Sequence, residues 1–129
     1  MARILVVEDE LLIVEDLKYK LSRLGHTVVG CATTGEAAVR KAAETKPELV
    51  MMDFRLRGEM NGMEAARHIR EIQDLPVVYV TAHANSVAAE CNAHPRQSFL
   101  TKPFTIDELE SVITTACSGK LRNEPNSVS

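Results

Sequence analysis

The chain has 129 residues, of which 45% are hydrophobic and 26% are charged, and its formal net charge is −3. This length supports one domain with its own core, and the acidic balance argues against a nucleic-acid surface, which is usually basic. No apolar run reaches the roughly 18 residues of a membrane span, and no signal-peptide core precedes Glu8. The three cysteines are widely spaced and no histidine pair has the HExxH spacing, so neither a disulfide framework nor a zinc site is predicted.

The N-terminal residues predict a strand followed by a helix. Arg3–Val7 is a β-branched apolar run, which is typical of a strand, and it ends at the acidic triplet Glu8 to Glu10. Alone, this triplet could simply be a solvated helix start, because acidic residues favour the positive end of the helix dipole. The helix that follows carries apolar residues at steps of three and four and ends at Gly25. These apolar positions are Val14, Leu17, Leu21 and Leu24.

A second strand and helix follow. The strand is predicted over Thr27–Cys31. Thr33 and Glu36 match a capping box, which predicts a helix that opens there and runs to about Thr45. Pro47 prevents this helix from continuing. Its apolar face is small and consists of Ala38, Val39, Ala42 and Ala43.

The third strand is predicted over Leu49–Asp53, where four consecutive apolar residues end in a carboxylate. Such a run is typical of a parallel strand buried on both faces. Asp53 therefore lies at the carboxyl end of its strand, where open α/β sheets bind ligands, although a single Asp more simply starts a turn. A helix begins near Met63, after a polar loop over residues 55–62. We expect Ala66, Ile69 and Ile72 to face inward and Arg67, Arg70 and Glu71 to be solvated.

The last two units repeat the pattern. Leu75–Val80 predicts a fourth strand that ends at Thr81, and residues 85–94 are weakly helical. A fifth strand over Gln97–Thr101 ends at Lys102 and Pro103. Thr105 and Glu108 match a second capping box. The helix that it opens has an apolar face made of Leu109, Val112, Ile113, Ala116 and Cys117.

Five strand–helix units predict an α/β fold, (βα)5, with a doubly wound parallel sheet of flavodoxin-like order 2-1-3-4-5. The composition becomes polar after Ser118, so we assign residues 1–118 to one domain and residues 119–129 to a polar tail or the start of a linker.

Four strand ends of this sheet carry polar side chains: Glu8, Asp9, Asp53, Thr81 and Lys102. In a parallel sheet they share one edge. Two unit charges about 4 Å apart repel by about 4 kcal/mol at an effective dielectric constant near 20, so the three carboxylates need compensation. Clustered carboxylates suit Mg²⁺, whose charge together with that of Lys102 would balance theirs. Asp53 could then act as a nucleophile and form an aspartyl-phosphate.

In this order and at these positions, the residues resemble the receiver domains of two-component response regulators, over essentially the whole chain to about Ser118. The resemblance implies that Asp53 accepts a phosphoryl group from a histidine kinase or phosphotransfer protein, with Mg²⁺ or Mn²⁺ as cofactor. The implied metal ligands are Glu8, Asp9, Asp53 and the backbone carbonyl of Arg55.

The resemblance also assigns residues to phosphoryl binding and switching. Thr81, Ala82 and Lys102 would contact the phosphoryl group, and Thr81 and Phe99 would form the switch. Phe99 is equally well explained as a core residue. Pro103 is a candidate for a cis bond with Lys102. The surface formed by the fourth helix, fifth strand and fifth helix would then change for a partner.

Further expectations follow from the resemblance. The protein would be a cytoplasmic switch of a bacterium or archaeon, not an enzyme that turns over a separate substrate. It would be a monomer or a weak phosphorylation-dependent dimer, with no direct contact to nucleic acid or membrane. Its downstream target or output domain stays open.

Some residues depart from the family pattern. Arg55 and His83 each lie two residues after a site residue, the loop from Asp53 to Gly62 is one residue longer, and the common proline is replaced near Arg57. We expect Arg55 and His83 to hinder attack by water and to lengthen the phosphoryl lifetime. Two alternatives are a degenerate receiver that acts as a constitutive interaction module and a flavodoxin-like small-molecule binder. The acidic loop after the first strand disfavours the binder, because it would repel a flavin phosphate.

Overall fold

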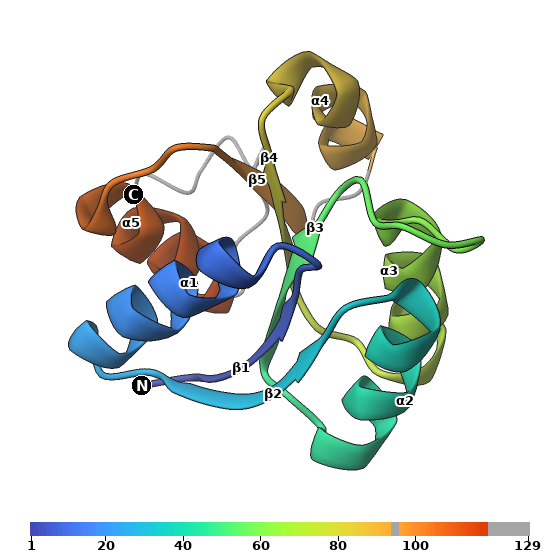
Figure 1. Ribbon diagram of the computed structural model, residues 1–129, viewed down its shortest axis with the longest axis horizontal. Helices are drawn as coiled ribbons and strands as arrows, with labels where there is room; N and C mark the ends of the chain where they lie inside the picture. The colour runs from blue at the N-terminus through green and yellow to red at the C-terminus, as the bar shows by residue number, and fades with distance from the viewer. Residues whose placement is uncertain (94–95, 119–129) are drawn as a thin grey trace.

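A computed structural model describes residues 1–93 and 96–118 of the chain, so the predicted tail and His94 lie outside the described residues (Figure 1). Strands and helices alternate along it, as predicted. The strands are β1 (Arg3–Val7), β2 (Thr27–Ala32), β3 (Leu49–Asp53), β4 (Val77–Thr81) and β5 (Gln97–Thr101). The helices are α1 (Leu11–Arg23), α2 (Gly35–Thr45), α3 (Gly62–Ile72), α4 (Ala84–Ala93) and α5 (Ile106–Cys117).

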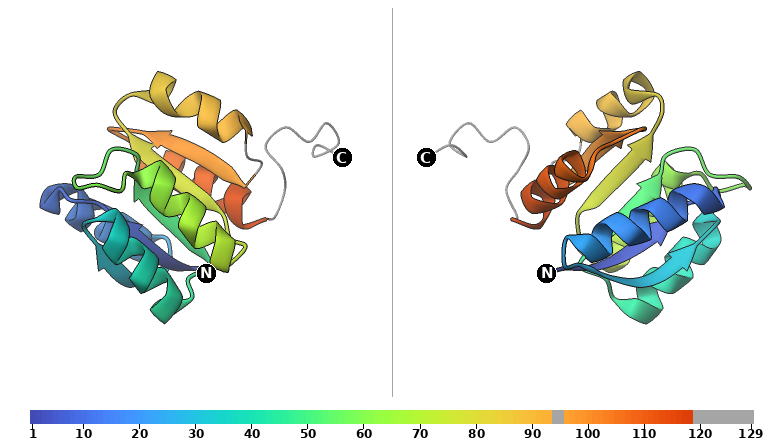
Figure 2. Two further views of the ribbon diagram at one scale, coloured as in Figure 1. Left: turned by 90° about the vertical axis from the view of Figure 1, so that its right-hand side faces the viewer. Right: turned by 60° about the vertical axis from the view of Figure 1, so that its left-hand side comes forward.

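All strands of the sheet are parallel and lie in the order β2-β1-β3-β4-β5, which confirms the predicted topology. Helices α1 and α5 cover one face, and α2, α3 and α4 cover the other (Figure 2). Strands β1 and β3 pair at the point where the strand order reverses, with Val7 opposite Met52. In doubly wound sheets this switch point is where a ligand crevice opens.

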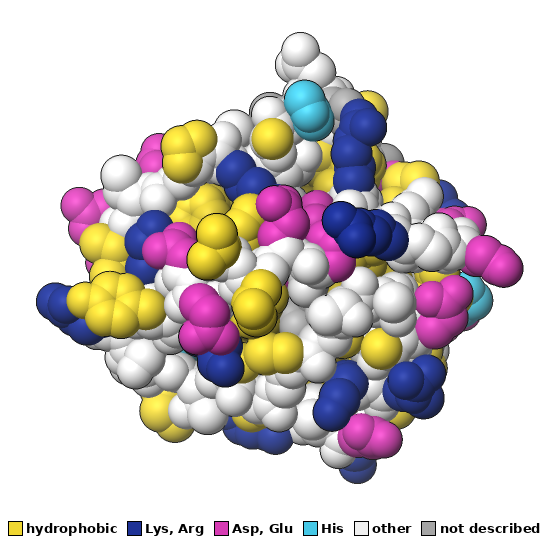
Figure 3. Space-filling model, in the orientation of Figure 1, with side chains coloured by type: hydrophobic (Ala, Val, Ile, Leu, Met, Phe, Trp, Pro, Cys, Tyr) yellow, Lys and Arg dark blue, Asp and Glu magenta, His cyan; other side chains and the backbone are white. Residues whose placement is uncertain are grey.

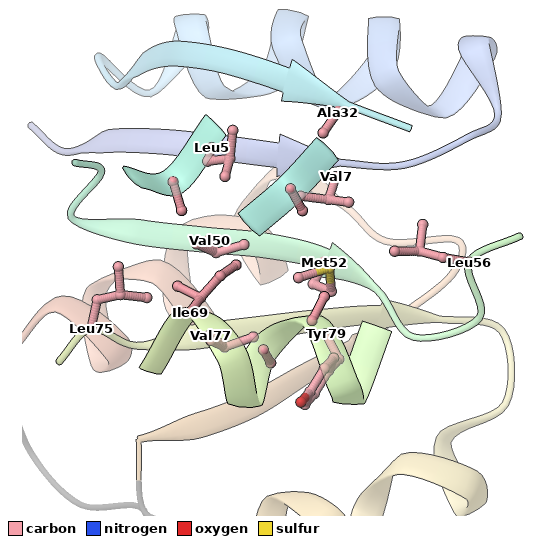
Figure 4. Packing of buried hydrophobic residues seen from close by; sticks show 14 of the residues in the cluster. Leu5, Val7, Ala32, Val50, Met52, Leu56, Ile69, Leu75, Val77 and Tyr79 are labelled. Atoms are coloured by element: carbon pink, nitrogen blue, oxygen red, sulfur yellow. The ribbon is translucent and has the colours of Figure 1, made fainter. Parts of the chain in front are cut away.

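The sheet separates two apolar clusters, because successive strand residues point to opposite faces. Leu5 and Met52 pack under α2 and α3 with other buried residues of that face (Figure 4). Ile4 and Met51, their neighbours in sequence, pack instead under α1 and α5. The inner strands are therefore buried on both sides, as the continuous apolar run of β3 predicts.

Helix α2 begins one residue later than predicted, and the capping box at Thr33 and Glu36 is wrong. Thr34 is the N-cap, and its side-chain oxygen accepts a hydrogen bond from the Ala37 backbone N–H at 3.1 Å. Only Thr33 has a glutamate three residues later, but Thr34 is the residue in extended conformation immediately before the first helical turn, so it caps the helix without a reciprocal glutamate. The second predicted box, between Thr105 and Glu108, is confirmed.

Two side chains of α3 also differ from expectation. Ile72, predicted to face inward, is 66% exposed at the last position of the helix, and Leu75 fills the core beyond it. Arg70 is not simply solvated, since its Nη1 donates a hydrogen bond to Gln97 Oε1 at 2.9 Å. Two small residues at the rims of other predicted apolar faces, Ala43 and Cys117, are exposed. None of the described helices is long and apolar enough to cross a bilayer.

Candidate functional site

The carboxyl ends of β1, β3, β4 and β5 meet at one edge of the sheet. Acidic and basic side chains lie next to each other over this edge (Figure 3). They border an open cavity of about 340 Å³. The residues that line it are Asp9, Glu10, Asp53, Arg55, Leu56, Arg57, Thr81, Ala82, His83 and Lys102.

Three carboxylates converge at the base of this cavity. One oxygen from each of Glu8, Asp9 and Asp53 lies within 4.8 Å of the others. Glu8 is 1% exposed and Asp53 6% exposed, so water screens their repulsion poorly. The sequence positions of these residues place them together because β1 and β3 are neighbours in the sheet.

Lys102 is the ammonium that the sequence places at the same edge. Its Nζ lies 3.2 Å from Glu8 Oε1, 3.9 Å from Asp53 Oδ2 and 3.8 Å from Glu10 Oε1. Its backbone N–H donates to the Thr81 carbonyl at 2.8 Å, which joins the ends of β5 and β4. The Lys102–Pro103 bond is cis, as anticipated for this candidate. One lysine thus balances part of a carboxylate cluster that carries more negative charge than it can neutralise.

Backbone groups orient the side chains of the site. The Arg55 N–H donates to Asp53 Oδ1 at 3.1 Å, and the Glu10 N–H donates to Glu8 Oε2 at 3.2 Å. The His83 N–H donates to the Thr81 hydroxyl oxygen at 3.0 Å. Because the Thr81 oxygen is the acceptor in that bond, its own proton remains available for a second group.

Burial, a hydrogen bond with Asp53 and repulsion from its carboxylate raise the pKa of Glu8 to about 7, and the Lys102 ammonium opposes this shift. Burial also raises the pKa of Asp53. Glu8 Oε1 accepts no hydrogen bond although it is fully buried. A buried oxygen without a hydrogen bond, beside two further carboxylates, fits the ligand set of a hard divalent cation such as Mg²⁺.

The loop between β3 and α3 packs tightly against the site. A Cβ atom at Gly62 would lie 2.3 Å from the Asp53 carbonyl oxygen, and one at Gly35 would lie 2.7 Å from the Met60 carbonyl oxygen. Glycine at both positions therefore allows the loop to close over β3 and against α2. Within the loop, Arg57 Nε lies 3.1 Å from Asp9 Oδ2.

The structure brings most of the predicted site residues together. Glu8 belongs to the carboxylate cluster with Asp9 and Asp53. The predicted site residues that line the cavity are Asp9, Asp53, Thr81, Ala82 and Lys102. Phe99 is not among the lining residues; it is half-buried and packs against the core cluster under α2, α3 and α4. The roles assigned to all of these residues, and to the Arg55 carbonyl, stay predictions.

Two contacts of the site are not anticipated from the sequence. Glu10 Oε1 lies 3.8 Å from the Lys102 ammonium. The acidic triplet Glu8 to Glu10 is the sequence signal that could have indicated this contact. Arg57 pairs with Asp9, and no sequence signal indicates this contact because the path of the long loop cannot be derived from periodicity.

Comparison with known proteins gives consistent matches. Residues 4–114 match the family described as the response regulator receiver domain. The chain is 35% identical over 115 residues to the phyllosphere-induced regulator PhyR of Methylorubrum extorquens, covering 88% of this chain and 42% of that protein. It is 36% identical over 117 residues to the transcriptional regulatory protein PdtaR of Mycobacterium tuberculosis, covering 90% of this chain and 57% of that protein. The chain therefore spans about half the length of these relatives.

Solved structures agree with this comparison. The receiver domain of PhyR from Erythrobacter litoralis superposes with a TM-score of 0.82 at 29% identity, covering 98% of this chain and 95% of that one. PhyR from Brucella abortus superposes with a TM-score of 0.81 at 30% identity, covering 91% of this chain and 48% of that one.

Proposed function

The chain belongs to the response regulator receiver domain family, and on that premise we propose that Asp53 accepts a phosphoryl group from a histidine kinase or phosphotransfer protein. The observation that carries the proposal is the convergence of three strand-end carboxylates and Lys102 on one cavity. The reaction modifies the domain itself, so we propose a switch, not an enzyme that turns over a separate substrate.

In the proposed reaction a carboxylate oxygen of Asp53 attacks the phosphorus of a phosphohistidine. A P–O bond forms and the P–N bond breaks, and the imidazole nitrogen keeps the electron pair of that bond and takes up a proton from solvent. The Arg55 N–H holds Asp53 Oδ1 at 3.1 Å, which leaves Oδ2, the oxygen nearer to Lys102, as the one that we assign to the attack.

Lys102 and Thr81 are proposed to bind the transferred group. The Lys102 ammonium lies 3.9 Å from Asp53 Oδ2, within reach of a phosphoryl oxygen attached there. The Thr81 hydroxyl retains a proton to donate, because its oxygen accepts from the His83 N–H. The exposed Ala82 lines the same cavity and is the third proposed contact.

The proposed cofactor is Mg²⁺ or Mn²⁺. The residues that would hold it are Glu8, Asp9, Asp53 and the Arg55 backbone carbonyl. When bound, the cation supplies positive charge that offsets the charge of the carboxylates and of the phosphoryl oxygens. The observation that supports a cation at this position is the cluster of three carboxylate oxygens within 4.8 Å of one another, of which Glu8 Oε1 is buried, accepts no hydrogen bond and lies 3.2 Å from the Lys102 ammonium.

We propose that phosphorylation is transmitted from Thr81 to Phe99. Thr81 lies at the end of β4, and Phe99 lies in β5, paired with Tyr79 of β4. Phe99 is half-buried beside a groove between β5 and α5 that also includes Val112. Attraction of Thr81 toward the phosphoryl group would open space for Phe99 and change this surface for a partner.

The test is the intact mass of the protein after incubation with acetyl phosphate and Mg²⁺. The wild type should gain one phosphoryl group, roughly 80 Da, which carries about two negative charges. Asp53→Asn should gain nothing, and Asp74→Asn, at an exposed aspartate two residues after the C-terminal end of α3, should behave as the wild type. A gain of equal size in Asp53→Asn would contradict the proposal, and no gain in any of the three would favour the degenerate-receiver alternative.

A further inference from the structure

Arg57 stands at the mouth of the acidic site and contacts a proposed metal ligand. Its Nε lies 3.1 Å from Asp9 Oδ2. The Arg57 side chain is 86% exposed, whereas that of Asp9 is 13% exposed. The carboxylate is therefore fixed in the site while the guanidinium reaches it from solvent.

Lys102 and Arg57 differ in how firmly they are held at the site. Lys102 is 16% exposed and lies within 4 Å of three carboxylates. Arg57 reaches a single described carboxylate, at the outer edge of the cluster. An exposed ion pair is weak and is screened by salt, so Arg57 can leave Asp9 at little cost, whereas Lys102 stays.

The position of Arg57 opposes a divalent cation in two ways. First, a cation that binds Asp9 must share or displace the guanidinium that occupies Oδ2. Second, the Arg57 guanidinium would place a positive charge next to the cation, and like charges repel. Both effects lower the affinity for the metal, whether Arg57 stays near Asp9 or moves away.

We propose that Arg57 competes with the divalent cation for Asp9 and thereby sets the metal affinity of the site. The inference rests on the proposed function, because it assumes that the carboxylate cluster binds Mg²⁺. It assigns to the long loop after β3 a role in deciding at which Mg²⁺ concentration the domain becomes able to accept a phosphoryl group.

The experiment measures the Mg²⁺ dissociation constant of the unphosphorylated full chain by isothermal titration at low ionic strength. Arg57→Gln removes the charge and keeps a polar, though shorter, side chain. Arg67→Gln, at an exposed arginine of α3 that does not line the cavity, is the matched control for a change of net charge. A second readout is the shift of the thermal unfolding midpoint as MgCl2 is added.

We expect Arg57→Gln to bind Mg²⁺ about threefold more tightly than the wild type, equivalent to about 0.7 kcal/mol, with Arg67→Gln unchanged. The difference should shrink in high salt because the pair is exposed. Unchanged or weaker binding by Arg57→Gln, or equal tightening in Arg67→Gln, would overturn the inference while leaving phosphoryl acceptance intact. A wild type that binds no Mg²⁺ but still incorporates phosphate would overturn both the inference and the proposed cofactor.

Discussion

Two regions of this domain bury polar side chains, and they do so in opposite ways. Around Gln97, which is 0% exposed, the side-chain oxygen accepts hydrogen bonds from the Tyr79 hydroxyl and Arg70, and the amide nitrogen donates to Glu90. At the acidic site, Glu8 is equally buried but its Oε1 accepts no hydrogen bond. The polar groups around Gln97 therefore satisfy one another by hydrogen bonds, whereas Glu8 Oε1 has only the Lys102 ammonium, 3.2 Å away, to offset its charge.

The largest effect is expected for a substitution in the hydrogen-bonded cluster around Gln97. Gln97→Met keeps the volume but removes the acceptor shared by Tyr79 and Arg70 and the donor to Glu90, so buried polar groups lose their partners. We expect the free energy of unfolding to fall by about 3 kcal/mol, measured by urea denaturation. Gln73→Met is the control, because the Gln73 side-chain amide donates to the Pro47 carbonyl at 2.8 Å, its one side-chain hydrogen bond among the described residues, and its loss should cost about 1 kcal/mol. Equal losses in the two variants would show that the Gln97 cluster has no special role.

At the acidic site, a substitution is expected to raise the free energy of unfolding instead of lowering it. Glu8→Gln should stabilise the protein in EDTA at pH 8 by about 2 kcal/mol, because it removes a buried charge that repels Asp53. A carboxyl with a higher pKa in the folded protein binds more protons when folded, so this group costs stability as the pH rises from its ordinary 4.5 to about 7.

The measurement is the unfolding free energy as a function of pH in the absence of divalent cations. The wild type should lose stability relative to Glu8→Gln across that window, and the two should converge below pH 4.5. If Glu8→Gln were less stable than the wild type at pH 8, the acidic site would be a satisfied structural cluster like that around Gln97.

A smaller effect is expected from Tyr79→Phe. The substitution removes one hydroxyl donor, but Gln97 Oε1 still accepts from Arg70 and the ring still packs edge-on against Phe54, with centroids 5.3 Å apart. We expect a loss of about 1 kcal/mol in urea denaturation. A loss as large as that of Gln97→Met would mean that the tyrosine, not the glutamine, holds this cluster together.

The smallest effect concerns the rim of the acidic site and depends on the proposed phosphorylation. Arg55 and His83 are exposed residues that line the cavity. Arg55→Asn and His83→Ala should each accelerate the loss of the phosphoryl group by about threefold, equivalent to about 0.7 kcal/mol in the barrier, because water reaches Asp53 more easily. The check is the decay of the phosphorylated mass after removal of the donor, and rates equal to that of the wild type would remove any shielding role.

The acidic site was accessible to sequence reasoning because each of its residues ends a strand. Continuous apolar runs locate β1 and β3, the alternation of strands and helices leaves a short strand over Gln97–Thr101, and the parallel topology then brings Glu8, Asp53 and Lys102 to one edge. The chemistry of the site follows from that placement without knowledge of any side-chain rotamer.

The Gln97 cluster was not accessible in this way. It joins side chains of α3, β4, α4 and β5 whose contacts depend on how each helix is rotated over the sheet. The helical period alone assigned Arg70 to solvent, and it could not distinguish Thr33 from Thr34 as a cap. Arg57 was missed for a related reason, since the conformation of an irregular loop is set by close packing and not by periodicity.

Gly35 and Gly62 allow the loop after β3 to pack closely beside the acidic site. Gly62 packs against the carbonyl oxygens of Asp53 and Phe54, and Gly35 packs against the Met60 carbonyl and side chain, so the C-terminal part of the loop is anchored to β3 and α2. The exposed side chains of Arg55 and Arg57 take no part in these anchoring contacts. On the proposed roles of Arg55 and Arg57, single replacements at these two positions would change metal affinity and phosphoryl lifetime while Asp53 and its neighbours stay the same.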